Sequence, residues 1–141
     1  MAGLRIPPST RVLVSEEKVY DSSNPYAPEK LSLILSLYGP PNFEQAVEIG
    51  LQLVSIGGLG HTSVLHTDAN DHRRIDYFAS KMLTSGLLIN LPASQGAIGF
   101  SNDGLTPSLI LGCGSWGGNA SSENVGIKHL LNYKTIVGKK D

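Results

Sequence analysis

The chain has 141 residues, of which 40% are hydrophobic and 16% charged, with a formal net charge of -1. This length is typical of one domain, and the composition allows a buried core, which excludes a disordered protein. The near-neutral charge argues against a nucleic-acid partner, and the lack of an apolar run of about 20 residues argues against a membrane span, so we expect a cytoplasmic protein.

The first part of the chain predicts two strands followed by a helix. Apolar residues alternate at 11–15, and an apolar run covers 31–38, so both segments are predicted strands, with a polar, proline-broken loop between them. Asn42 is a good helix N-cap, with Gln45 as its capping-box partner. One helical face is then apolar, and Gly57 and Gly58 should end the helix; the face comprises Phe43, Ala46, Val47, Leu51 and Val54.

A strand, a helix and a further strand are predicted next. Residues 61–67 have strand character, and the turn at 68–72 should cap a second helix that ends at Gly86, before a strand at 87–90. The apolar stripe of this helix comprises Ile75, Phe78, Ala79 and Met82. The alternation predicts an α/β fold with a mostly parallel sheet and crossover helices.

The pattern is weaker from residue 91 onward. We expect a glycine-rich loop at 91–108, a brief strand at 108–112, one or two helical turns within 123–132, and a last strand at 135–137. Residues 1–10 and 138–141 are expected to be flexible.

The segment GCGSWG at 112–117 matches the G-x-G-x-x-G spacing of a dinucleotide-binding turn. That turn belongs near the start of a strand–helix–strand unit with an acidic residue about 20 positions on, and no second such unit fits into the residues that follow. We therefore interpret the glycines as a tight structural turn.

Cys113 is the only cysteine, so neither an internal disulfide nor a cysteine-based zinc cluster can form. A catalytic thiolate would need a cation or a paired histidine, and sequence cannot bring His129, His61 or His66 to it; a small buried cysteine is the alternative. His61 and His66, five residues apart, would point to opposite faces of a strand, so we predict no metal site.

Glu29 lies just before a predicted strand, between Pro28 and Lys30. A carboxylate at the entrance of a strand can accept hydrogen bonds from the hydroxyl groups of a ligand. The alternative is a solvated charge in a loop.

Four segments together resemble the CoA-acylating aldehyde dehydrogenases, in particular the aldehyde-dehydrogenase half of the bifunctional acetaldehyde–alcohol dehydrogenases. They are APEKLSLILSLY, FEQAVEIGLQLVSIGGLGHTSVLHT, LLINLPASQGAIG and LTPSLILGCGSWGGNASSENVGIKHLLNYKTI. The resemblance covers about residues 10–137. It implies that residues 1–141 form a single, partial aldehyde-dehydrogenase-like catalytic domain, the C-terminal part of the complete one.

The resemblance also implies an oxidoreductase that converts an aldehyde, CoA and NAD into acyl-CoA and NADH. Glu29 matches the glutamate that binds the nicotinamide ribose hydroxyls, and Leu31 falls beside the nicotinamide. His61 matches a histidine of the acylating branch near the active site, and it is our candidate catalytic residue.

The family's nucleophilic cysteine and nucleotide-binding domain precede the position of Glu29 and have no counterpart here, because Cys113 matches a different family cysteine. We therefore expect a segment of an enzyme, inactive alone, that exposes apolar surface and either self-associates or joins a larger dehydrogenase chain. The partners implied are a small aldehyde and CoA. The alternative is a stand-alone, non-catalytic module that binds a nucleotide, CoA or a full-length dehydrogenase.

Overall fold

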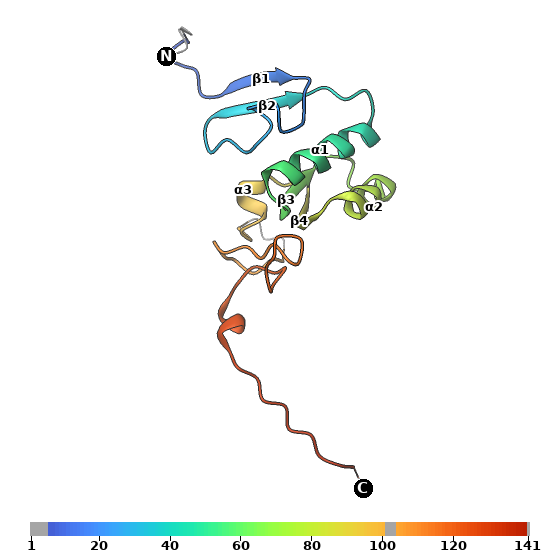
Figure 1. The fold of residues 1–141 in the computed structure, drawn as a ribbon. Helices are drawn as coiled ribbons and strands as arrows, with labels where there is room; N and C mark the ends of the chain where they lie inside the picture. The colour runs from blue at the N-terminus through green and yellow to red at the C-terminus, as the bar shows by residue number, and fades with distance from the viewer. Residues whose placement is uncertain (1–5, 101–103, 141) are drawn as a thin grey trace. The chain divides into compact units, whose positions relative to one another are not determined.

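The computed structural model describes residues 6–100 and 104–140 (Figure 1). The order of the first six elements confirms the predicted α/β pattern. The elements are β1 Leu13–Glu17, β2 Ile34–Tyr38, α1 Phe43–Gly57, β3 Gly60–Leu65, α2 His72–Lys81, β4 Thr84–Ile89, α3 Ala93–Gly96 and the short 3-10 helix η1 Ile127–Leu130.

The chain divides into two compact units. The first unit comprises Met1–Leu59 and Asn70–Thr84, and it holds β1, β2, α1 and α2. The second unit comprises Gly60–Ala69 and Ser85–Asp141, and it holds β3, α3, η1 and all of β4 except Thr84. Within the described residues, the strands form two separate two-stranded sheets, β1–β2 and β3–β4, instead of one.

The sheet of the first unit is parallel, with Leu13 opposite Ile34 and Glu17 opposite Tyr38. Side chains alternate between the two faces of each strand. One face carries half-buried residues, whereas the other carries exposed ones, including Val14 opposite Leu35.

Helices α1 and α2 supply the apolar core of the first unit. Asn42 caps α1 as predicted, because its Oδ1 accepts a hydrogen bond from the Gln45 backbone N–H at 2.9 Å. The buried side chains are Val47 from α1, Phe78 from α2, and Met82 just after α2. The predicted apolar faces are therefore confirmed, except that Ala79 is exposed.

The second helix ends earlier than predicted. Its last backbone bond runs from the Met82 N–H to the Phe78 carbonyl, and Met82 itself has extended backbone geometry. Gly86, predicted to end the helix, lies inside β4 instead. A side chain there would crowd Thr62 of β3, because an added Cβ would lie 3.1 Å from the Thr62 hydroxyl.

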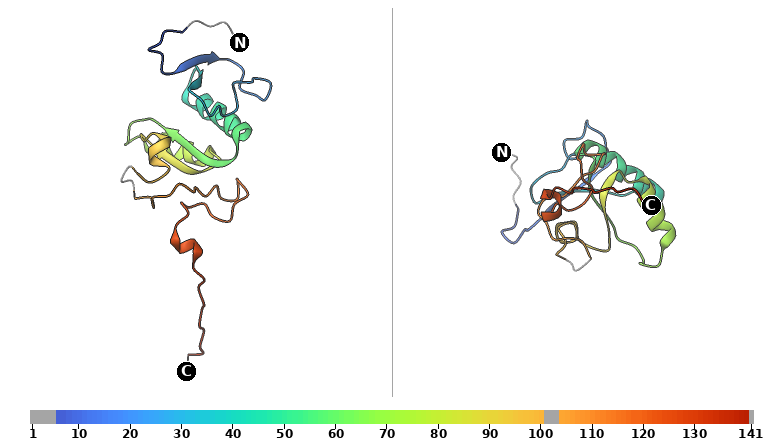
Figure 2. Two further views of the ribbon diagram at one scale, coloured as in Figure 1. Left: turned by 90° about the vertical axis from the view of Figure 1, so that its left-hand side faces the viewer. Right: turned by 90° about the horizontal axis from the view of Figure 1, so that it is seen from below.

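The second unit contains β3 and β4 side by side (Figure 2). Thr62 lies beside Gly86, and the Asn90 N–H donates to the Leu65 carbonyl at 2.9 Å, so the two strands run in the same direction. Asn90 has a positive φ of 57°, and its side chain exchanges two hydrogen bonds with the Thr67 backbone. This reciprocal pairing joins the carboxyl ends of the two strands.

Residues 110–114 and 121–125 form a hydrogen-bonded loop rather than the strand predicted at 108–112. The Gly112 N–H donates to the Glu123 carbonyl, and the Gly114 N–H donates to the Ser121 carbonyl. An added Cβ on Gly112 would lie 2.6 Å from the Glu123 carbonyl oxygen, so only glycine permits this approach.

Other predictions for the C-terminal part are partly wrong. The predicted loop at 91–108 contains the short helix α3, and its residues 101–103 lie outside those described. Helical turns occur within 123–132 as η1, whereas 135–137 is extended and exposed without forming a strand (Figure 1). The expected flexibility of 1–10 and 138–141 remains a prediction, and residues 1–5 and 141 lie outside those described.

Candidate functional site

His61 and Cys113 form a close pair in the second unit. The Cys113 Sγ lies 3.3 Å from His61 Nδ1 and 3.9 Å from Nε2. The thiol is buried, with Cys113 only 7% exposed, whereas His61 is exposed. The structure thus brings together a sulfur and an imidazole that are 52 residues apart.

The sequence around the pair explains why the loop comes so close to β3. Gly60, immediately before His61, has a φ of +88°, and an added Cβ would lie 2.8 Å from the Cys113 Cβ and collide with the Cys113 carbonyl oxygen. The Cys113 N–H in turn donates to Asn119 Oδ1 at 3.1 Å. Glycine on the strand and a closed turn in the loop therefore position the thiol against the ring.

The other candidate partners of Cys113 contact different groups. His129 Nδ1 accepts a hydrogen bond from the Gly126 N–H at 2.9 Å, and its Nε2 lies 3.4 Å from the Ser121 hydroxyl. His66 follows β3 and is exposed. The prediction that GCGSWG forms a tight turn is confirmed, because residues 114–118 are all in turns.

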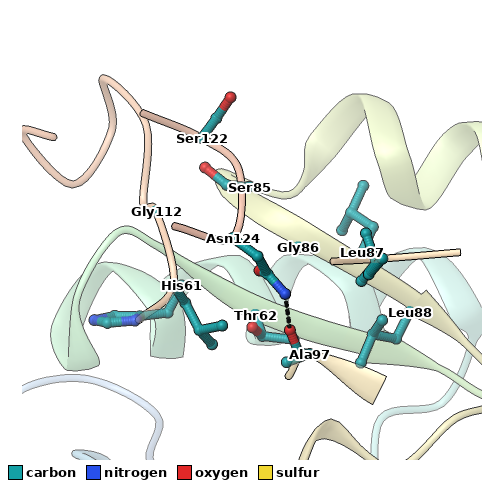
Figure 3. Close-up of a pocket in the computed structure, with 12 residues that line it drawn as sticks. His61, Thr62, Ser85, Gly86, Leu87, Leu88, Ala97, Gly112, Ser122 and Asn124 are labelled. Atoms are coloured by element: carbon teal, nitrogen blue, oxygen red, sulfur yellow. Dashed lines mark hydrogen bonds between the residues drawn. The ribbon is translucent and has the colours of Figure 1, made fainter. Parts of the chain in front are cut away.

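A small pocket of about 170 Å³ also lies in the second unit (Figure 3). Its wall includes Ser85, whose buried hydroxyl has no hydrogen-bond partner among the described residues, together with Thr62, Ser122 and Asn124. The His61 ring points away from these side chains in Figure 3. Pockets that bury drug-sized ligands have volumes of about 300–1,000 Å³, so this pocket by itself is too small for a dinucleotide.

Glu29 and Leu31 lie in the first unit, in the loop between β1 and β2. Glu29 is exposed, and its carboxylate has no hydrogen bond or ion pair within the described part of the chain. Leu31 is 94% exposed. His61 belongs to the second unit, so the three predicted site residues are divided between the units.

Asn24 organises this loop, and sequence reasoning missed it. Asn24 is 7% exposed, and its amide donates to Glu17 Oε2 at 2.8 Å and to the Val19 carbonyl at 2.6 Å. Its Oδ1 accepts from the Tyr26 N–H at 2.8 Å. The run DSSNP gives a turn signal but does not indicate that one of its polar residues is buried.

Among the residues that the structure describes, three ionisable groups have perturbed pKa values. Burial, and then the nearby negative charge of Glu17, raise the pKa of Tyr38. A hydrogen bond from Lys128 and its positive charge lower the pKa of Glu123, and hydrogen bonds from Ser23 lower the pKa of Asp21.

Known proteins resemble this chain over its whole length. The bifunctional aldehyde-alcohol dehydrogenase AdhE of Escherichia coli K12 is 52% identical over 100% of this chain, which covers 16% of that enzyme. A probable aldehyde dehydrogenase from Listeria monocytogenes EGD-e matches 97% of this chain and 30% of its own, with a TM-score of 0.86 and 38% identity. An acetylating aldehyde dehydrogenase from Geobacillus thermoglucosidasius gives a TM-score of 0.82 at 34% identity, covering 100% of this chain and 32% of its own.

The α/β fold and these likenesses place the chain among the aldehyde dehydrogenases. Within that class, the chain belongs to the CoA-acylating aldehyde dehydrogenase family, as the resemblance of its four segments predicts. It spans only about a sixth of the bifunctional relative and under a third of the two solved structures.

Three features are absent. No family model matches the chain. Within residues 6–100 and 104–140, no three histidine, cysteine or carboxylate side chains are grouped as metal ligands would be. No helix in the described part of the sequence is both long and apolar enough to cross a bilayer.

Proposed function

We propose that this chain is a segment of an NAD-dependent, CoA-acylating aldehyde dehydrogenase that acts on a small aldehyde in the cytoplasm. In this proposal, Glu29 accepts hydrogen bonds from the nicotinamide ribose, Leu31 packs against the nicotinamide, and His61 acts near the reacting carbonyl. NAD supplies the hydride acceptor when it is bound, and CoA receives the acyl group.

The observation that carries the proposal is the exposure of the Glu29 and Leu31 side chains. The Glu29 carboxylate is exposed and has no partner within the described residues, so its oxygens are available to ligand hydroxyls. Two positions later, Leu31 is 94% exposed. Covering such a side chain with the face of a ligand ring would gain about 25 cal/mol for each Å² of apolar surface removed from water.

We further propose that these 141 residues alone do not turn over an aldehyde. Cys113 is the only thiol, and it is buried against His61 instead of standing open to a substrate. Loss of a catalytic nucleophile in a well-studied protease lowers kcat on the order of 10⁶-fold. Binding of NAD and chemical turnover are therefore separate properties of this chain.

A titration of NADH, followed by its fluorescence, tests the cofactor proposal. Replacing Glu29→Gln should weaken binding about tenfold, because a charge-assisted hydrogen bond contributes about 1.5–3 kcal/mol. Glu16→Gln is the matched control, because Glu16 is an exposed glutamate of the same unit in β1. Equal affinities for the wild type and both variants would reject the role of Glu29.

Leu31→Ala separates binding from folding. Because Leu31 is 94% exposed, its truncation should leave the thermal midpoint unchanged while NADH binds several-fold more weakly. An unchanged affinity would reject the packing role of Leu31.

A second candidate function, association with a larger dehydrogenase chain, is favoured by one face of the β1–β2 sheet. Val14, Leu35 and Leu37 on the strands, with Val12 and Leu33 just before them, are all more than 40% exposed. By contrast, no large hydrophobic residue of α1 or α2 is exposed. Among these elements, the exposed apolar surface therefore lies on the strands.

Light scattering tests the association. Contiguous apolar surface of this kind should make the isolated chain self-associate and bind a hydrophobic dye. The double variant Leu35→Ser, Leu37→Ser should scatter as a monomer with less bound dye, whereas Leu109→Ser, at an exposed residue of the second unit, should not change either signal. A wild-type monomer without bound dye would contradict this proposal.

A further inference from the structure

His129 joins two segments of the second unit through its two ring nitrogens. It is the third residue of the short helix η1. Its Nδ1 accepts a hydrogen bond from the Gly126 N–H at 2.9 Å, and its Nε2 lies 3.4 Å from the Ser121 hydroxyl. One nitrogen therefore contacts the residue that precedes η1, and the other contacts the hydrogen-bonded loop at 121–125.

The bond at Nδ1 is half of a capping box. In a capping box, the side chain of the third helical residue accepts a hydrogen bond from the N–H of the N-cap residue, and that side chain is usually Glu or Gln. Here Gly126 is the N-cap and His129 is the third residue. Histidine differs from the usual acceptors because it changes its charge between about pH 5 and 8.

The direction of this bond determines which ring nitrogen carries the proton. The Gly126 N–H can only donate, so Nδ1 is the acceptor. A neutral imidazole has one donor and one acceptor nitrogen, which places the proton of the neutral ring on Nε2, toward the Ser121 oxygen. In the imidazolium both nitrogens are donors, so protonation removes the acceptor of the Gly126 N–H.

A second partner for the protonated ring lies on the same residue. The Gly126 carbonyl oxygen is 3.2 Å from His129 Nδ1, and it already accepts the His129 backbone N–H at 3.0 Å. A carbonyl oxygen has two lone pairs, so it can accept a further hydrogen bond from a protonated Nδ1. Protonation thus exchanges a bond to the Gly126 N–H for a bond to its carbonyl, while Nε2 remains a donor.

The charged neighbours of the ring keep their charge in this pH range. On the two segments that His129 joins, the other titratable residues are Glu123 and Lys128. They form an exposed ion pair between Glu123 Oε2 and Lys128 Nζ. A hydrogen bond from Lys128 and its positive charge lower the pKa of Glu123, so its carboxylate stays ionised while the ring titrates. His129 is therefore the group whose charge changes on these segments.

We propose that His129 is a pH-sensitive cap of η1, whose neutral ring holds the Gly126 N–H and whose protonated ring releases it. The first turn of η1 is then fixed at the higher pH and loosened at the lower pH. Residues 131–140, which are exposed and form neither helix nor strand, follow this turn directly. The inference goes beyond the proposed dehydrogenase function and does not depend on it.

NMR of the intact chain tests the cap, because an N–H···N hydrogen bond gives a scalar coupling between its two nitrogens. The Gly126 amide nitrogen should couple to His129 Nδ1 at about pH 8, where the ring is neutral. Lowering the pH until the ring nitrogen shifts report the imidazolium should abolish the coupling and move the Gly126 amide proton upfield. No coupling to the neutral ring, or an amide proton that does not move, would overturn the proposal.

Substitutions separate titration of this ring from other effects of pH. His129→Gln keeps an acceptor that does not titrate, so the Gly126 amide should lose its pH dependence. His129→Ala should leave the amide without its partner at both pH values. The matched control is His66→Gln, at another exposed histidine of the second unit, and it should retain the wild-type profile. A wild-type profile in His129→Gln would overturn the role of this ring.

Discussion

The two units of this chain are stabilised in different ways. The first has a small apolar core of Val47, Phe78 and Met82, contributed by and next to two amphipathic helices. The second buries Leu88, Ala97 and Cys113, and it adds close backbone approaches at glycines and hydrogen bonds between loops, as at Gly60 and Gly112. The first unit should therefore be most sensitive to lost side-chain volume, and the second unit should be most sensitive to any added atom.

Phe78→Ala should produce the largest effect on the first unit. Truncation of a buried phenylalanine typically lowers the free energy of unfolding by about 3–5 kcal/mol. Circular dichroism at the helical band reports chiefly on this unit, because α1 and α2 hold most of the helical residues. Ser80→Ala, at an exposed site of α2, is the control and should change little; a Phe78→Ala variant as stable as this control would contradict the core assignment.

Gly60→Ala should produce the largest effect on the second unit. The added methyl group meets the Cys113 backbone and must also adopt a positive φ, so we expect a loss of about 2–5 kcal/mol. Fluorescence of Trp116, the only tryptophan, reports on this unit.

Gly118→Ala is the matched control for that substitution. Gly118 has a φ of +69°, but no atom in the described part of the chain lies within 4 Å of an added Cβ, so only the backbone strain of about 1–2 kcal/mol applies. Equal losses in the two variants would mean that the close approach at Gly60 does not contribute to stability.

Asn24→Ala should have an intermediate effect. It tests whether the first unit also depends on one buried polar group. The substitution removes the donor to Glu17 Oε2 and to the Val19 carbonyl, which should cost about 1–3 kcal/mol in urea unfolding. Ser22→Ala, in the same exposed turn, should be neutral. If both variants unfold alike, the bonds of Asn24 contribute nothing measurable.

Tyr38 should give the smallest effect, and a pH-dependent one. Its pKa is raised in the folded state, so above about pH 10 the unfolded chain releases the phenolic proton first, and stability falls as pH rises through the folded pKa. The Tyr38→Phe variant should lose less stability than the wild type between neutral and strongly alkaline pH. Parallel pH profiles would contradict the raised pKa.

The sequence predicts the first unit better than the second, for a physical reason. Helical periodicity identifies Val47 and Phe78 directly, because each belongs to a series of apolar residues three or four positions apart. His61 and Cys113 are separated by 52 residues, and no local pattern predicts their contact. The only local signals are Gly60 and the glycines around Cys113, which indicate close approach but not the partner.

The predicted site residues depend on a different kind of information. Resemblance to a family indicates Glu29, Leu31 and His61, and their roles remain proposals. Their exposure could not be predicted from composition, because whether Leu31 is covered depends on long-range packing. Strand predictions at 108–112 and 135–137 are wrong, because an apolar run predicts a strand only if a neighbouring backbone completes its hydrogen bonds.

The most direct test of the central functional claim is an assay of NADH formation from acetaldehyde, CoA and NAD by the purified 141-residue chain. We expect no NADH above the control without protein, because the single buried thiol is paired with His61. NADH formation that requires CoA and is lost in Cys113→Ser would contradict this claim, and would make Cys113 the nucleophile.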